Sequence, residues 1–288
     1  FAKKKLDINK ENLSLLERQV ETDQNRLENG LITLADLAQS ESSLAGAEAQ
    51  FINSKNDLVT AKLTYEKIIG PLDDIDLING SIKLDFNIPE SLNKSIELST
   101  GNNPDLKIAK LKYEQSQQDI KMAIAEFSPT AKISAESTKS NDLSSTVDER
   151  DQETFKAEIS WPLFKGGKNS AFLERSKRLN KRMKLLLDNA IKTNETKVAS
   201  AWSSFQSSES ALKSVRSQVN AAEIANEGIT IEYETGLGRT TLDVIQSNTI
   251  LLTSRINLAN SERNLFLSQL ELLKSVGLLN AKYLKIVK

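Results

Sequence analysis

The sequence contains the same helix-turn-helix signature twice, and this repeat constrains the fold more than any other feature. The first copy covers residues 29–40 and the second covers residues 235–247. The glycines of the two copies lie 206 positions apart and their aspartates 207 apart, so the second turn holds one additional residue. Matching residues then stay in register as far as Gly70 and Gly277. So long a match without gaps predicts two duplicated helical hairpins.

Each signature has the residues of a tight helix-helix turn. Gly30 and Gly236 can adopt the left-handed conformation that ends the incoming helix. Thr33 stands three residues before Asp36, and the same spacing precedes Asp243 in the second copy. A threonine followed three residues later by an acid forms a capping box, which starts the outgoing helix. We therefore expect the two glycine turns to be the hairpin tips.

The incoming arm of the second hairpin is unusually long. Residues 168–233 contain no proline and a single glycine, Gly228, so one helix of up to about 100 Å is possible. Its apolar residues recur at steps of three and four and form a narrow seam, while the other faces are polar. Such a helix cannot bury itself alone. The sequence therefore predicts lateral partners for it.

A connector with a different composition separates the two hairpins. Proline and glycine punctuate residues 71–103, where we expect irregular structure around a short helix at residues 89–99. Asn103, Pro104 and Asp105 then supply an N-cap, a proline in the first turn and an acid, which open a helix that Pro129 closes.

Residues 129–139 and 155–161 show the strong β signal of the chain, because apolar and polar residues alternate there. The pattern predicts two strands of about ten residues joined by a long, polar, acidic connection at residues 140–152. One interpretation is a transmembrane barrel hairpin, and the other is a half-exposed soluble hairpin. In the barrel interpretation, the lumen-facing residues are Lys132, Glu136, Lys156 and Glu158. The lipid-facing residues are Ile133, Phe155, Ile159 and Trp161, with both aromatic residues as interfacial anchors.

Composition excludes several classes of function. Hydrophobic residues make up 39% of the 288 residues and aromatic residues 5%, which is a low apolar content for a protein with a compact core. The net charge is -1 with both signs interspersed, so we predict no nucleic-acid partner. His and Cys are absent, which removes Ser-His and Cys-His catalysis and the commonest metal sites. We therefore predict no enzyme activity, no cofactor and no metal site. No apolar run is long enough for a transmembrane helix.

Four motifs resemble the TolC family of outer-membrane efflux proteins, and their order and spacing match that family over the whole chain. They are Asn-Asn-Pro-Asp-Leu at residues 102–106, Trp-Pro-Leu-Phe-Lys-Gly-Gly at 161–167, the second tip at 236–244 and Gly-Leu-Leu-Asn at 277–280. The stretch at 239–244 is most similar to members that serve type I protein secretion and multidrug efflux.

The resemblance implies a mainly α fold. Long antiparallel helical hairpins would form the protomer of an α-barrel tunnel, and the two-stranded β-hairpin would contribute to a trimeric transmembrane β-barrel. It further implies a homotrimer in the Gram-negative outer membrane with a periplasmic extension. The expected partners are outer-membrane lipid, a periplasmic adaptor (membrane fusion protein) and an inner-membrane pump. The resemblance also implies a further strand pair and a descending helix before Phe1, and the start of the chain within a helical pattern fits that expectation.

The resemblance also implies roles for the tip residues. In the family, polar contacts between and within protomers close the entrance. The matching gate and latch positions are Asp36, Tyr233 and Arg239, and three copies of Asp243 would form an acidic pore constriction. Gln246 replaces a second acid that many members have one turn further on. Local roles remain open: both aspartates cap helices, Tyr233 packs against the turn, or Arg239 is a solvated charge.

The predicted segments follow from these patterns. They are the first periplasmic hairpin at 1–70, an equatorial connector at 71–103, a helix at 104–128, the transmembrane β-hairpin at 129–164, the second hairpin at 165–277 and a tail at 278–288. We predict a subunit of a trimeric export duct for tripartite efflux or type I secretion. The alternative is a periplasmic adaptor or coiled-coil scaffold without a pore, which explains the helices but not the duplicated tips or the strand pair.

Overall fold

The computed structural model describes residues 1–72, 84–85, 88–144, 147–280 and 285–286. The chain forms two compact units, one of residues 1–96 with 197–288 and the other of residues 97–196. The long helix α5 (Lys168–Glu234) contributes to both units. Parts of the predicted connector and tail, at 73–83, 86–87, 281–284 and 287–288, lie outside the described residues.

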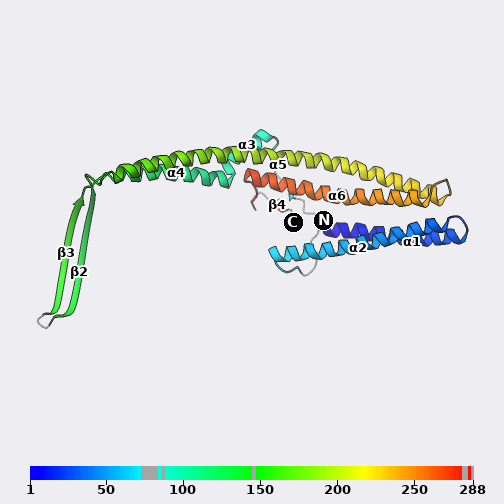
Figure 1. Ribbon diagram of the computed structural model, residues 1–288, viewed down its shortest axis with the longest axis horizontal. Coiled ribbons are helices and arrows are strands. Elements are labelled where there is room, and N and C mark those ends of the chain that lie inside the picture. The colour runs from blue at the N-terminus through cyan, green and yellow to red at the C-terminus, as the bar shows by residue number, and fades with distance from the viewer. Residues whose placement is uncertain (73–83, 86–87, 145–146, 281–284, 287–288) are drawn as a thin grey trace. The chain divides into compact units, whose positions relative to one another are not determined.

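In the first unit, α1 (Ala2–Glu28) and α2 (Leu34–Ile68) form the first helical hairpin (Figure 1). Gly30 has a φ of 72°, the left-handed conformation predicted for the turn. The amide of Leu31 donates to the carbonyl of Arg26 at 2.8 Å and the amide of Gly30 donates to that of Leu27 at 2.9 Å. This pair of bonds is a Schellman motif, which satisfies carbonyl groups at the end of α1.

The second hairpin pairs the end of α5 with α6 (Thr241–Val276), and its turn repeats the first one. Gly236 has a φ of 74°, and Leu237 donates to the carbonyl of Glu232 at 2.9 Å, again as in a Schellman motif. Gly238 has a φ of 82° and no counterpart in the first turn. A left-handed glycine thus accommodates the additional residue, and Thr240 still caps the outgoing helix.

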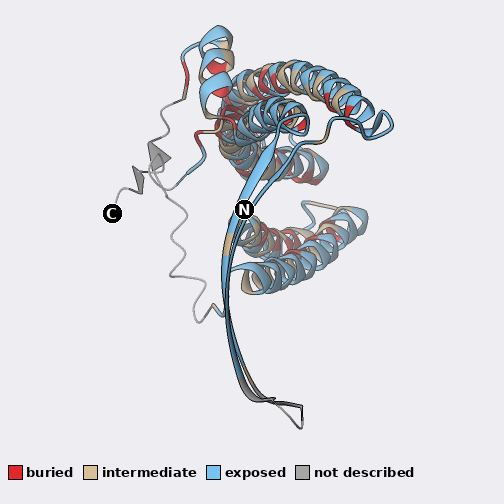
Figure 2. Cartoon of the chain, turned by 90° about the vertical axis from the view of Figure 1, so that its left-hand side faces the viewer, coloured by how far each residue is buried: buried red, intermediate tan, exposed pale blue. Residues whose placement is uncertain are grey.

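The two hairpins pack against each other within this unit, where α1 contacts both α2 and α6. The core of this unit includes small polar side chains, because Ser40, Ser54 and Ser254 are fully buried, as are the apolar residues Val244 and Leu272. Figure 2 shows the buried residues as narrow stripes along helices whose other faces are exposed. A low content of apolar residues suits this arrangement, since thin helical layers need less apolar volume than a globular core.

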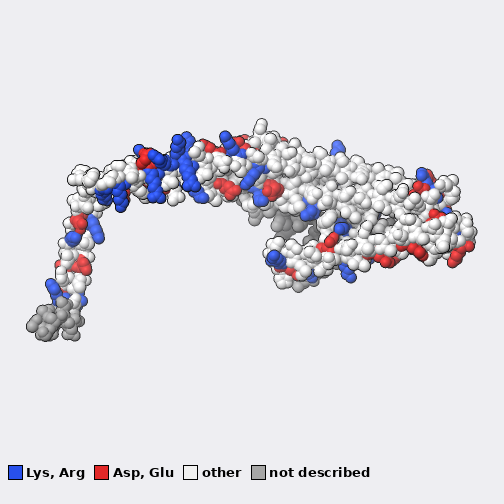
Figure 3. Space-filling view, in the orientation of Figure 1, with Lys and Arg blue, Asp and Glu red and all other residues white. Residues whose placement is uncertain are grey.

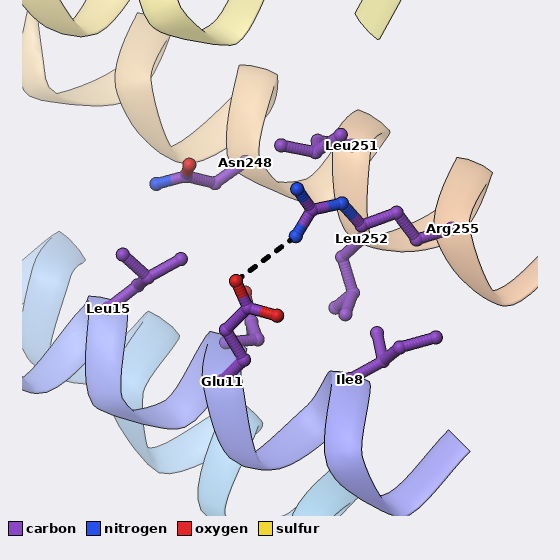
Figure 4. Close-up of a pocket in the computed structure, with 8 residues that line it drawn as sticks. Ile8, Glu11, Leu15, Asn248, Leu251, Leu252 and Arg255 are labelled. Carbon is purple, nitrogen blue, oxygen red and sulfur yellow. Dashed lines mark hydrogen bonds and ion pairs between the residues drawn. The ribbon is translucent and has the colours of Figure 1, made fainter. Parts of the chain in front are cut away.

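Ion pairs and a small cavity mark the contact between α1 and α6 (Figure 4). The guanidinium of Arg255 on α6 lies 3.3 Å from Glu11 on α1 and 3.0 Å from Glu223 on α5. Apolar side chains flank this pair. Ile8 and Leu15 are among the residues that line a cavity of about 20 Å³ there. Arg255 therefore joins three helices of the two hairpins at a partly exposed site.

The remaining strands of the first unit are two short segments, β1 (Leu84–Asp85) and β4 (Lys285–Ile286). They pair antiparallel, with Leu84 opposite Ile286. This pairing ties the connector after α2 to the end of the chain. The sequence patterns did not predict it, because two-residue strands leave no periodicity to detect.

In the second unit, α4 (Pro104–Ala125) packs along the first part of α5, and buried amides hold the two helices together. Asn103 caps α4 through its Oδ1 atom and donates from Nδ2 to Asn194 at 2.7 Å. Asn194 donates in turn to the hydroxyl of Ser99 at 2.7 Å on α3 (Leu92–Asn102). Nearer the start of α5, Asn180 donates to Ser116 at 2.9 Å. A polar ladder therefore fixes the register of these helices.

The β-hairpin consists of β2 (Thr130–Ser144) and β3 (Val147–Ser160), and its strands are longer than predicted. Cross-strand pairing continues through Ser140 opposite Arg150 and Asn141 opposite Glu149, so the connection predicted at residues 140–152 was wrong in extent. Backbone hydrogen bonds do not require alternating side chains, which explains why a polar stretch can still pair. Residues 145–146 of the connection lie outside the described part of the chain.

Candidate functional site

A buried polar cluster joins all four helices near the two hairpin tips, and its centre is the fully buried carboxylate of Asp23 on α1. The hydroxyl of Tyr233 on α5 donates to Asp23 Oδ1 at 2.7 Å, and the hydroxyl of Ser40 on α2 donates to Oδ2 at 2.5 Å. Gln19 donates to both oxygens, at 3.0 and 3.1 Å. Thr241 on α6 lies 3.1 Å from the Tyr233 hydroxyl. We call these five residues the tip cluster.

Arg26 adds a second contact between the hairpins. Its Nη1 atom donates to the carbonyl of Tyr233 at 3.1 Å, and its guanidinium carbon lies 4.1 Å from the centre of the Tyr233 ring. This stacking is a cation–π contact, which is stronger at a partly desolvated site. Within the described part of the chain, the buried Nε atom of Arg26 has no hydrogen-bond partner. Tyr233 is therefore held at its ring, its hydroxyl and its carbonyl.

The surroundings of Tyr233 raise its pKa. Burial is the largest cause, since it disfavours a phenolate, and the hydrogen bond to Asp23 acts in the same direction. The phenol therefore stays protonated and donates to a carboxylate that accepts several hydrogen bonds. A buried charge with this many donors is stable, whereas the loss of one donor would leave an oxygen partly unsatisfied.

The predicted gate residue Asp36 and the predicted constriction residue Asp243 have equivalent local structures. Each is half-buried and accepts from the amide and hydroxyl of the preceding threonine in a capping box. These bonds to Thr33 and Thr240 lower the pKa of both carboxyl groups, so both stay ionised. The capping interpretation of the sequence is therefore confirmed for both. Their gate and constriction roles, which depend on neighbouring protomers, remain predictions.

Arg239 pairs with a residue that the sequence did not point to. Its Nε atom lies 2.6 Å from Glu232 Oε2, and this carboxylate raises the pKa of the guanidinium. Among the described residues, Arg239 forms no ion pair with Asp36, whose Oδ2 atom is engaged by Thr33. An exposed pair of this kind is easily exchanged. The latch between Arg239 and Asp36 remains a prediction for contacts between protomers.

On the β-hairpin, the register separates the predicted residues into two faces. Lys132 lies opposite Glu158, and Lys156 pairs with Glu158 at 2.7 Å. By the alternation of a strand, Lys132, Glu136, Lys156 and Glu158 share one face. The other face carries Ile133, Phe155 and Ile159, which are 86%, 81% and 78% exposed. Nothing within the described chain covers this apolar face.

Trp161 continues the apolar face at the base of the hairpin. It is 62% exposed, and its Nε1 atom donates to the carbonyl of Phe127 at 3.2 Å. Asn169, at the start of α5, donates to the carbonyl of Glu126 at 2.7 Å. These two bonds join the ends of the β-hairpin to the ends of α4 and α5.

Sequence reasoning identified Tyr233 but missed its partners Asp23, Arg26 and Thr241. One signal for Asp23 was present, because it follows Leu16 and Val20 at steps of four and three and so occupies an apolar position of the helical period. A charged residue in a seam needs a partner, although the pattern does not name that partner.

No group of three or more acidic, His or Cys side chains in the described part of the chain is arranged to hold a metal ion. None of the helices in the described ranges has the length and apolar character that a membrane crossing requires.

Comparison with known proteins identifies the family. A family model described as "Outer membrane efflux protein" matches residues 96–278, which is more than half of the chain. This chain belongs to the outer membrane efflux protein family. That family comprises efflux channel proteins and is not an enzyme family. The resemblance inferred from the motifs at 102–106 and 161–167 is therefore confirmed.

Curated relatives agree with this assignment. The chain is 24% identical over 278 residues to the outer membrane efflux protein BepC of Brucella suis, with 96% of this chain and 60% of that protein covered. It is 22% identical over 278 residues to the outer membrane protein TolC of Escherichia coli, with 91% and 56% covered. The chain thus spans about three fifths of the length of these relatives.

Solved structures of outer-membrane proteins share the fold. The outer membrane protein VceC of Vibrio cholerae matches with a TM-score of 0.75 at 21% identity, over 96% of this chain and 66% of that one. The open state of the MtrE channel of Neisseria gonorrhoeae matches with a TM-score of 0.69 at 18% identity, over 96% and 65%. The predicted fold of long helical hairpins with a two-stranded β-hairpin is confirmed.

Proposed function

We propose that this outer membrane efflux family chain is a subunit of a trimeric export duct in the Gram-negative outer membrane. The observation that carries the proposal is the two-faced β-hairpin, whose apolar face is exposed from Ile133 to Trp161 while its other face carries charges. An isolated two-stranded hairpin with an uncovered apolar face is unstable in water. In a membrane barrel, lipid would cover the apolar face and the charged face would line the lumen. Neighbouring strands would pair with both edges of the hairpin.

The proposal gives the helical hairpins the role of a periplasmic tunnel. Their narrow buried stripes leave exposed apolar residues such as Leu185, Ile224 and Ile250, which are 61%, 65% and 57% exposed. Helices with such faces need lateral partners, and copies of the same chain supply them in a homotrimer. A periplasmic adaptor and an inner-membrane pump are the proposed partners for tripartite efflux or type I secretion.

The tip cluster supports a closed entrance in this proposal. Asp23 and Tyr233 tie the first hairpin to the second within one protomer, and opening the tunnel mouth requires the hairpins to separate there. Arg239, Asp36 and Asp243 lie on the adjacent turns, where contacts with other protomers would complete the closure. We infer that three Asp243 carboxylates form a ring that favours cations, because the lowered pKa keeps each of them ionised.

The alternative of a scaffold without a pore is not favoured, since the family and the shared fold are those of efflux proteins. The complete protein, purified in detergent, tests the proposal. We expect sedimentation as a trimer and ion-conducting pores after insertion into planar bilayers. A soluble monomer that forms no pores would contradict the duct and support the scaffold.

A further inference from the structure

The start of α5 carries a dense positive charge that the proposed function leaves unexplained. We call residues 165–184 the basic segment. It contains a single acid, Glu174, and eight basic residues, all exposed: Lys165, Lys168, Arg175, Lys177, Arg178, Lys181, Arg182 and Lys184. Figure 3 shows this charge as a run of blue over the part of α5 that adjoins the β-hairpin.

The rest of the same helix has the opposite charge balance. Residues 185–234 contain four basic and seven acidic side chains. The helix α4, which packs along the start of α5, is close to balanced, with four basic and three acidic residues. The positive charge is therefore specific to the end of α5 that adjoins the β-hairpin, and is not a general property of these helices.

The basic segment is not neutralised within the described chain. Arg178 pairs with Glu174 at 3.1 Å, and none of the other seven basic residues forms an ion pair with a described residue. Arg175, Arg178 and Arg182 follow one another at steps of three and four, where like charges repel across a helix turn. They line a shallow open groove together with Ala171, Glu174 and Leu179. An anionic partner would relieve this repulsion.

The segment begins where the apolar surface ends. Trp161, Leu163 and Phe164 are 62%, 80% and 87% exposed, and Lys165 is the next residue along the chain. The hydrogen bonds of Trp161 and Asn169 to the chain after α4 fix the base of the hairpin beside the start of α5. The surface therefore changes from aromatic and apolar to cationic within a few residues, which is the order of layers in a lipid monolayer.

We propose that the basic segment binds the anionic phospholipid headgroups of the leaflet into which the β-hairpin inserts. This inference rests on the proposed function, which puts the hairpin in a membrane. A cluster of basic residues next to a membrane-spanning element is attracted to anionic lipid, and the attraction decays over a Debye length of about 8 Å. Since the helix rises about 1.5 Å per residue, Lys165, Lys168 and Arg175 contribute most and Lys184 least.

The test uses the complete trimer, purified in detergent and titrated with phosphatidylglycerol or with zwitterionic phosphatidylcholine, and native mass spectrometry counts the retained lipids. The near variant is Lys165→Gln/Lys168→Gln/Arg175→Gln, and the far variant is Lys181→Gln/Arg182→Gln/Lys184→Gln. The control, Lys192→Gln/Lys197→Gln/Lys213→Gln, removes the same charge from exposed positions farther along α5.

The wild type is expected to retain phosphatidylglycerol over phosphatidylcholine. The near variant should weaken phosphatidylglycerol binding about tenfold or more, the far variant less, and the control not measurably. Equal binding by the wild type and the near variant would overturn the inference, as would equal retention of the two lipids. Displacement of phosphatidylglycerol by millimolar inorganic phosphate would assign the segment to free phosphate and overturn it too.

Planar-bilayer recordings of the same proteins separate this inference from the proposed function. A wild type that forms no pores would contradict the duct, whatever its lipid binding. Pores in every variant together with unchanged lipid retention would contradict the lipid site alone. A near variant that keeps its lipids but loses conductance for anions would assign the charge to the lumen and would also overturn the lipid site.

Discussion

The hydroxyl of Tyr233 on α5 donates a hydrogen bond of 2.7 Å to the buried carboxylate of Asp23 on α1, across 210 positions of sequence. This bond joins the end of one hairpin to the end of the other. Because Asp23 also binds Ser40 on α2 and Tyr233 also contacts Thr241 on α6, one hydrogen-bonded group spans four helices. Separation of the tips would have to break it.

Removal of the Tyr233 hydroxyl should destabilise the folded protein measurably. We expect Tyr233→Phe to lower the free energy of unfolding by about 1–3 kcal/mol, since the change leaves an oxygen of buried Asp23 with fewer donors. Chemical denaturation of the complete protein, followed by circular dichroism, measures the loss. Tyr65→Phe on α2 is the control. Equal losses for the two variants would mean that the hydrogen bond contributes nothing specific.

Neutralisation of Asp23 should have a larger effect than loss of one donor. In Asp23→Asn, an amide group replaces an oxygen that accepts from Tyr233 or Ser40, so donors face each other in a buried site. We expect a loss of about 2–4 kcal/mol in the same denaturation experiment. Asp57→Asn, which removes an exposed partner of Lys5, should cost less than about 1 kcal/mol. A loss for Asp23→Asn as small as for Asp57→Asn would contradict the assignment.

The raised pKa of Tyr233 predicts an alkaline effect. A group whose pKa is higher in the folded state stabilises the fold below its unfolded pKa, which is about 10 for tyrosine. That stability should decrease as the pH rises above about 10 toward the higher pKa of the folded protein. Denaturation of the wild type and of Tyr233→Phe across this range checks the sign. The difference between the two should shrink as the pH rises, and a constant or growing difference would contradict the assignment.

The lowered pKa values of Asp36 and Asp243 predict the opposite dependence in acid. Their carboxylates stabilise the turns above the unfolded pKa near 4, and this stability should disappear as the pH falls through the lower pKa of the folded state. Nuclear magnetic resonance titration of the side-chain carboxyl carbons reports both values. Thr33→Ala and Thr240→Ala should each raise the pKa of the acid in the same turn only. A titration unchanged by these variants would contradict the capping-box cause.

The partner of Arg239 can be decided by comparison of three variants. If the resting tip depends on a latch between protomers, Arg239→Ser and Asp36→Asn should raise resting conductance alike, and Glu232→Gln should not. If the resting tip depends on the pair with Glu232, Arg239→Ser and Glu232→Gln should raise the resting conductance alike, and Asp36→Asn should not. No change in any of the three would remove Arg239 from the gate. Single-channel recording of the complete protein distinguishes these results.

Local sequence signals were sufficient for the helical hairpins and their turns. Gly30 and Gly236 were identifiable because a left-handed residue and a capping box depend on neighbours within a few positions. The even alternation around Ile133 and Phe155 likewise predicted the strands, although the paired region extends into a polar stretch without a pattern. Features set by one or two turns of chain were therefore predictable.

Pairings between distant residues could not be predicted in the same way. Asp23 stood out only as a charge in an apolar seam, and no local rule connects it to Tyr233. Arg239 pairs with Glu232 within the described chain, and no local spacing rule singles out that carboxylate. Such choices depend on how helices pack and on which donors are already engaged, and both are properties of the folded chain.

The resting conductance of the complete protein in planar bilayers tests the central claim most directly. The claim is that the chain belongs to an export duct whose tips are held together by Asp23 and Tyr233. It predicts pores of low resting conductance for the wild type and for Asp57→Asn, and a clearly higher conductance for Asp23→Asn. Wild-type protein that forms no pores, or Asp23→Asn pores with wild-type conductance, would contradict the account.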